Sequence, residues 1–142
     1  MASKTRLLER IRKLDSEGVA NDLLDAPELI GFRDDRGRNW LHLCAGVDVV
    51  KRRLDPRASV DIARVLLDFG LDVNEPAFTE GSWQATALWY AVGRGRNLPL
   101  ATFLLDNHST PEHCLWAAAF NEDGDILRLL IDRGAPLEAV AE

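Results

Sequence analysis

Three short stretches of this chain open in the same way, and their recurrence constrains the fold more than any other feature. Each places a small residue two positions after a side chain that carries a ring. The stretches are residues 40–45, 87–92 and 114–119. Small side chains let neighbouring backbones approach closely, so each stretch predicts a short helix that packs tightly against others. Internal repeats of this kind are typical of stacked architectures.

A second apolar run follows each opening, with apolar residues spaced i, i+3, i+4 along one helical face. These runs are residues 60–67, 100–105 and 126–131. Gly70, Gly134 and His108 stand where a helix C′ residue belongs. Ser59 and Asp123 are predicted N-caps, and Pro99 suits a first helical turn.

The units so defined are helix pairs that cannot bury their apolar faces alone, and we therefore expect them to stack into one all-α domain over residues 1–142. The N-terminal segment fits as a degenerate capping pair, because its leucines and other apolar residues form two helical stripes. Four helix pairs are predicted. They are a capping pair over 1–31, a unit over 32–74, a unit over 75–108 and a C-terminal capping unit over 109–142.

This pattern resembles the ankyrin repeat, whose units open with Gly-x-Thr-Pro-Leu-His and close with Leu-Leu-x-x-Gly-Ala-Asp-Val-Asn. Residues 37–45 follow the opening, with Asn39 in place of Thr and Trp40 in place of Pro. Residues 66–74 and 130–138 match the closing. The resemblance covers nearly the whole chain. It implies an ankyrin-type α-solenoid of stacked helix pairs joined by loop or β-hairpin fingers.

The chain departs from the ankyrin pattern at several places. An insert of about ten residues falls near 47–58, relative to the usual unit length. The loop after Gly70 is longer than in the family, whereas the loop from His108 to His113 is shorter, which predicts the loss of a hairpin finger there. Trp89 and Trp116 replace the family's His, and we interpret both, with Trp40, as packing residues.

No catalytic or metal-binding constellation stands out in the sequence. His42 with Cys44, and His113 with Cys114, lack the spacing of a zinc site. Residues 93–96 lack the Lys-Ser/Thr of a phosphate-binding loop, so we interpret them as an inter-helix turn. We expect no enzyme, cofactor or metal. A His/Cys metal protein or an enzyme that uses His113 and Cys114 is the least favoured alternative.

The chain carries a net negative charge that is unevenly distributed along the sequence. Seventeen basic residues against 23 acidic ones give a net charge of −6. Residues 1–53 carry 11 basic and 9 acidic residues, a net +2, whereas residues 54–142 carry 6 and 14, a net −8. An acidic surface disfavours phosphate backbones, so the basic run 51–53 is interpreted as a solvated loop and no nucleic acid is expected.

The same composition predicts where the protein resides. No apolar run is long enough to span a membrane, and the N-terminus has no secretory apolar region. Cys44 and Cys114 lie inside apolar patterns and are expected to be free, reduced thiols. These features predict a cytoplasmic protein without a membrane partner.

The ankyrin resemblance implies a non-catalytic module that binds another protein through a concave face and loop fingers. Carried over position by position, the predicted protein-binding residues are Asp35, Arg36, Arg38, Val47, Phe78, Ser82, Trp83, Arg94, Glu112, Phe120 and Asn121. The net charge favours a basic partner. A narrower hypothesis is an inhibitor, such as an immunity protein of a cognate toxin or enzyme.

A self-associating structural subunit is the alternative to partner binding. It is suggested by the apolar C-terminal residues Leu137, Ala139, Val140 and Ala141. We expect a monomer or weak self-association.

Overall fold

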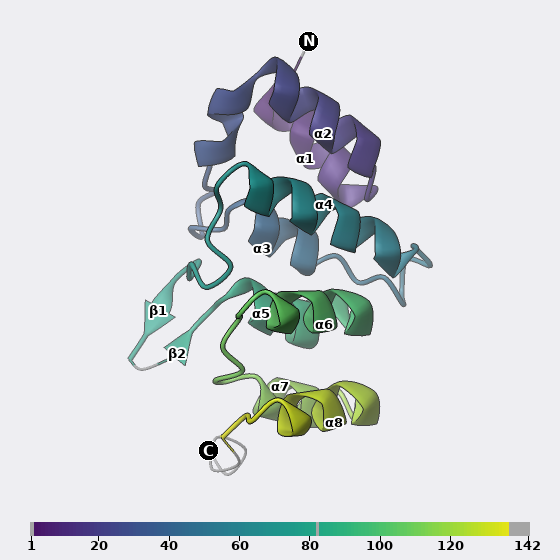
Figure 1. The fold of residues 1–142 in the computed structure, drawn as a ribbon, viewed down its shortest axis with the longest axis vertical. Coiled ribbons are helices and arrows are strands. Elements are labelled where there is room, and N and C mark those ends of the chain that lie inside the picture. The colour runs from purple at the N-terminus through teal and green to yellow at the C-terminus, as the bar shows by residue number, and fades with distance from the viewer. Residues whose placement is uncertain (1, 82, 137–142) are drawn as a thin grey trace.

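A computed structural model of the chain describes residues 2–81 and 83–136, and nearly all of its regular structure is helical (Figure 1). Eight α-helices lie within the described residues. They are α1 (Lys4–Arg12), α2 (Ser16–Asp25), α3 (Trp40–Ala45), α4 (Pro56–Asp68), α5 (Ala87–Tyr90), α6 (Leu98–Asp106), α7 (Leu115–Phe120) and α8 (Gly124–Asp132). A 3-10 helix, η1 (Pro27–Gly31), follows α2, and a π-helical turn, η2 (Ala91–Gly95), continues α5.

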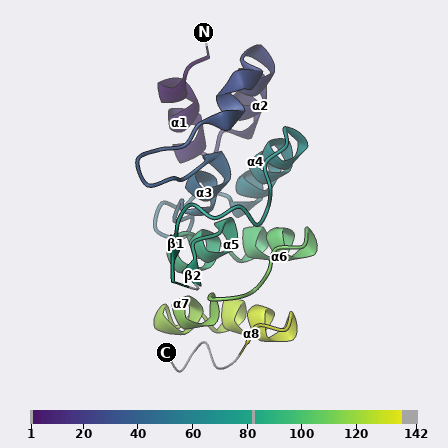
Figure 2. The same cartoon turned by 90° about the vertical axis from the view of Figure 1, so that its left-hand side faces the viewer.

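The helices form antiparallel pairs that lie one above another. Helix α1 packs on α2, α3 on α4 and α7 on α8, while α6 packs on α5 and its η2 extension. Each pair contacts the next along the chain. Helices α1, α3, α5 and α7 lie along one side of the molecule, and α2, α4, α6 and α8 lie along the other (Figure 2). The all-α prediction is therefore confirmed. None of the described helices is long and apolar enough to cross a membrane.

A short antiparallel hairpin is the only sheet among the described residues. Strand β1 (Thr79–Glu80) pairs with β2 (Trp83–Gln84), with Thr79 opposite Gln84. The hairpin projects to the left of the stacked helices in Figure 1, beyond the end of α5. It lies in the long loop after Gly70, whereas residues 108–113 contain no strand.

Polar side chains start most of these helices by accepting a backbone N–H, which satisfies donors that have no partner within the helix. Asp123 caps α8 as predicted, and Pro99 lies in the first turn of α6. The predicted cap Ser59 is wrong. Helix α4 begins four residues earlier, where Asp55 accepts from Arg57 N–H and Pro56 takes the first position. Pro56 favours this start because its fixed φ and missing N–H suit the first helical turn.

Residues with a left-handed backbone conformation end α4, α6 and α8, as the sequence predicted. Gly70 and Gly134 have φ of 104° and 88°, and His108 takes the same position with φ of 75°. These residues turn the chain back toward the next helix pair.

The core runs through the stack between the two rows of helices. Ala45, Ala91 and Ala118 are fully buried at the short-helix positions where close approach was predicted, whereas Ala119 is exposed. Gly95 lies so close to α3 that a Cβ atom there would come 2.2 Å from the carbonyl oxygen of Ala45. Small residues thus allow α3 and η2 to touch along their backbones.

The predicted insert near 47–58 is only partly a loop. Residues 56–58 form the first turn of α4, which the sequence reasoning missed. Val47 and Val49 are buried, and Val49 N–H donates to the Gly95 carbonyl at 3.3 Å. The segment between α3 and α4 is therefore attached to the next helix pair. The predicted turn 93–96 differs as well, because residues 93–95 belong to η2.

Candidate functional site

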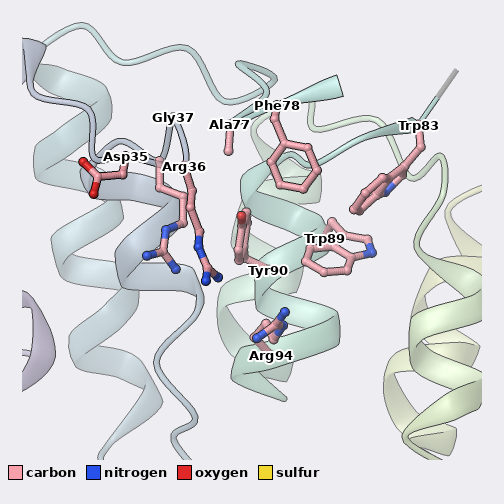
Figure 3. Close-up of a pocket in the computed structure, with 10 residues that line it drawn as sticks. Asp35, Arg36, Gly37, Ala77, Phe78, Trp83, Trp89, Tyr90 and Arg94 are labelled. Carbon is pink, nitrogen blue, oxygen red and sulfur yellow. The ribbon is translucent and has the colours of Figure 1, made fainter. Parts of the chain in front are cut away.

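A pocket of about 660 Å³ opens on the side of the short helices (Figure 3). We call it the aromatic pocket. It lies between the turn that precedes α3, the hairpin β1–β2 and α5 with η2. Its lining residues are Asp35, Arg36, Gly37, Arg38, Ala77, Phe78, Trp83, Trp89, Tyr90 and Arg94.

One wall of the aromatic pocket is a turn organised by Asp34. One carboxylate oxygen of Asp34 accepts the backbone N–H groups of Arg36 and Arg38, each at 2.9 Å, and the other accepts Arg38 Nε at 2.7 Å. Burial opposes ionisation of Asp34, but these hydrogen bonds outweigh it and hold the pKa below its usual value. Arg38 is thereby fixed, while the neighbouring Arg36 side chain stays exposed.

Gly37 allows this turn to reach the hairpin. Its φ of 77° lies in the left-handed region, and a Cβ atom there would come 2.2 Å from the carbonyl oxygen of Ala77. A larger residue would therefore push the turn away from the hairpin and open the pocket wall.

The opposite wall is a chain of aromatic rings in edge-on contact. The ring centroids of Phe78 and Trp83 lie 5.1 Å apart, those of Trp83 and Trp89 5.2 Å, and those of Trp89 and Tyr90 5.1 Å. Interplanar angles of 68–87° match the preferred edge-to-face geometry. The Arg94 guanidinium lies 5.8 Å from the centroid of Trp89. The wall is therefore held in place without a ligand.

His42 anchors the base of the hairpin loop to α3. It accepts the Asn39 backbone N–H at Nδ1 (3.0 Å), so the ring proton lies on Nε2 and is donated to the Glu75 carbonyl at 2.7 Å. The ring is buried and tilted against Tyr90, with centroids 5.7 Å apart. Burial lowers the pKa of His42 to about 4. A neutral imidazole with both nitrogens occupied is a structural element rather than a free acid or base.

A second pocket of about 400 Å³ adjoins the first and shares Arg38, Tyr90 and Arg94 with it. Its remaining lining residues come from α1, α3 and the segment after α3. They are Leu8, Ile11, Arg12, His42, Leu43, Gly46, Val47, Asp48 and Arg52. We call the two joined pockets the arginine groove.

The structure brings together six of the predicted binding residues, because the aromatic pocket is lined by Asp35, Arg36, Arg38, Phe78, Trp83 and Arg94. Val47 lines the second pocket, with only 8% of its surface exposed. Glu112 lies in the turn before α7, Phe120 at the end of α7 and Asn121 directly after it, and none of them lines either pocket. Ser82 and the apolar C-terminal residues 137–141 lie outside the described residues.

Two residues of the last helix pair have contacts that the sequence did not predict. Asn121 Nδ2 donates to the Val92 and Gly93 carbonyls, each at 3.2 Å, so its side chain ties α7 to η2. Trp116 is not a core packing residue, because 49% of its surface is exposed. It stacks on Phe120, which is 72% exposed, with the centroids 5.1 Å apart.

Sequence reasoning missed Trp89, Tyr90, Arg12 and Arg52 as site residues. Trp89 packs against the core, as expected, but it is only partly buried and also forms the centre of the aromatic wall. Its position in α5, five residues before Arg94 in the η2 continuation, was the available signal. Trp40, by contrast, is fully buried and donates from its indole to the Leu29 carbonyl at 2.8 Å, as a packing residue should.

The thiols and histidines do not assemble a reactive centre in the described part of the chain. Cys44 and Cys114 are both buried, and burial raises the pKa of each thiol to about 12. No group of three or more His, Cys, Asp or Glu side chains within residues 2–81 and 83–136 is placed to hold a metal ion.

No family model matches the sequence, and no curated protein is significantly similar to it.

Proposed function

We propose that this protein is an ankyrin-type repeat module that binds a segment of another protein in the aromatic pocket. The observation that carries the proposal is the edge-to-face chain from Phe78 to Tyr90, which forms a preformed aromatic wall opposite the Arg36–Arg38 turn. Large rigid aromatic side chains and arginines are the residues that most often dominate protein-binding energy.

The ankyrin-type assignment is supported by the order of the elements. A short helix and a longer helix alternate, a hairpin projects before the third pair, and the residues matched to the closing of the repeat end α4 and α8. The buried capping box between Asn39 and His42 supports the match of residues 37–45 to the repeat opening. Together these features support an α-solenoid whose short helices and hairpin form the binding face.

The pre-organisation of the pocket supports binding rather than catalysis. Gly37, Asp34 and His42 fix the turn and the hairpin base through short backbone contacts. A surface that is already ordered loses little conformational entropy on association, which favours affinity.

The direct test is capture of the partner from the native host with a tagged full-length chain. We expect a stoichiometric partner that is lost with a Phe78→Ala/Trp83→Ala variant and kept with a Phe120→Ala control, because Phe120 lies outside both pockets. A partner kept by the first variant and lost by the control would place binding on the last helix pair and refute the proposal.

A further inference from the structure

The arginine groove is a locally basic surface on this acidic chain. Five arginines line it, against two acidic residues, Asp35 and Asp48. With Asp34, which pairs with Arg38, also counted, the groove carries a local excess of two positive charges, whereas the whole chain has a net charge of −6. The five arginines are Arg12, Arg36, Arg38, Arg52 and Arg94.

Arginines on the other side of the stack are neutralised by neighbouring aspartates. Arg64 lies 3.6 Å from Asp61 on α4, and Arg128 lies 3.8 Å from Asp125 on α8. Arg133, just after α8, contacts Asp106 of α6 at 2.8 Å. The long helices therefore carry compensated charge.

Most of the groove arginines lack such neighbours. Four of them, namely Arg12, Arg36, Arg52 and Arg94, make no ion pair with any described residue, and Arg38 pairs only with Asp34 of its own turn. In Figure 3 the Asp35 carboxylate points away from the aromatic side chains, and Arg94 lies beneath Tyr90 and Trp89. The guanidinium groups next to the aromatic wall thus remain open to an external anion.

We propose that the occupant of the groove is an acidic protein segment that also carries an apolar or aromatic side chain. This inference rests on the proposed function. Carboxylates of the segment would pair with Arg36 and Arg94, since guanidinium binds carboxylate through two parallel hydrogen bonds. The apolar side chain would lie against Trp83 and Trp89.

An acidic segment suits this face better than the basic partner expected from total charge. Net charge describes the long-range field, whereas the contact surface is set by the side chains that line it. A nucleic acid would also meet the arginines, but the net charge of −8 on residues 54–142 repels an extended polyanion. A short segment with a few carboxylates avoids that repulsion.

The test is selection of peptides by the full-length chain from a random library displayed on yeast. Wild-type protein is expected to enrich peptides with an excess of Asp and Glu and at least one aromatic or large apolar residue. An Arg36→Glu/Arg94→Glu variant should bind those peptides at least about tenfold more weakly and select basic peptides instead. Arg128→Glu changes charge on the far side and should select the same peptides as wild type.

The alternative outcomes separate this inference from the proposed function. Enriched peptides that lack an acidic excess but are lost with Phe78→Ala/Trp83→Ala would overturn the inference and leave the proposed function standing. If no peptide is enriched, the inference fails, and the capture experiment decides the proposed function independently. The inference would also be overturned in favour of nucleic acid if the chain bound single-stranded oligothymidylate more tightly than the selected peptides and the Arg36→Glu/Arg94→Glu variant lost that binding.

Discussion

The amide of Asn97 donates a 2.8 Å hydrogen bond to the hydroxyl of Ser59, and both side chains are buried where α4 meets the start of α6. Asn97 also caps α6, because its Oδ1 accepts the Leu100 N–H at 3.0 Å. Ser59 in turn donates to the Pro56 carbonyl in the first turn of α4. One amide therefore links the starts of two consecutive long helices.

Replacing Asn97 should be costly. Asn97→Ala removes a helix cap and leaves the buried Ser59 hydroxyl with one partner fewer, so we expect a loss of about 2–4 kcal/mol in the free energy of unfolding. Asn107→Ala is the control, because the Asn107 side-chain amide donates to the Phe103 carbonyl within its own helix end. Urea denaturation measures both, and equal midpoints would refute the linking role of Asn97.

Protonation of His42 at low pH should lower the free energy of unfolding of the protein. The folded-state pKa is about 4, below the ordinary value of 6.5, so the unfolded chain binds the proton more readily. Stability from the neutral ring is fully present above about pH 6.5 and is lost progressively toward pH 4, by roughly 3 kcal/mol.

Urea titrations at pH 5 and pH 7 test this dependence. His42→Gln should reduce the difference in unfolding free energy between the two pH values, whereas His108→Asn, at an exposed helix end, should keep it. A pH dependence that is unchanged in His42→Gln would contradict the assignment.

Gly37 should tolerate no side chain. Gly37→Ala places a Cβ atom against the Ala77 carbonyl in a left-handed conformation, so we expect a loss of about 1–3 kcal/mol in stability. Gly124→Ala is the matched control, since a Cβ atom there meets nothing within 4 Å. Thermal unfolding followed by circular dichroism would show a lower midpoint only for Gly37→Ala. No change in that variant would mean that the turn does not press against the hairpin.

The two thiols should be unreactive in the folded protein. Both are buried with a pKa of about 12, so the reactive thiolate is scarce and shielded. A chromogenic disulfide reagent should label them only slowly in buffer and rapidly in concentrated urea. Fast labelling of either cysteine in buffer would show that its helix pair opens readily.

The sequence predicted the elements better than the site, for physical reasons. Helical spacing and end signals are local, so residues 60–67 and 126–131 were found inside α4 and α8. The wrong cap at Ser59 arose because Asp55 and Pro56 offered a competing start one turn earlier. The match to the ankyrin repeat also located six residues of the aromatic pocket, because this repeat places turn and hairpin residues on one face.

The rest of the site depends on contacts between helix pairs. Trp89 and Trp116 occupy the same position in successive units, yet only Trp89 meets a hairpin and becomes part of a pocket wall. Arg12 and Arg52 join Arg94 from segments far apart in the sequence. No local sequence pattern predicts that these arginines lie together, and the net negative charge of the chain gives no indication of a basic surface.

The affinity of the captured partner for Trp89→Ala and Trp116→Ala, measured by isothermal titration calorimetry, tests the central claim most directly. Both variants remove an indole from the same repeat position, but only Trp89 lines the aromatic pocket. We predict at least about tenfold weaker binding for Trp89→Ala and an affinity within about twofold of wild type for Trp116→Ala. Weaker binding of Trp116→Ala alone would contradict the account and place the interface on α7.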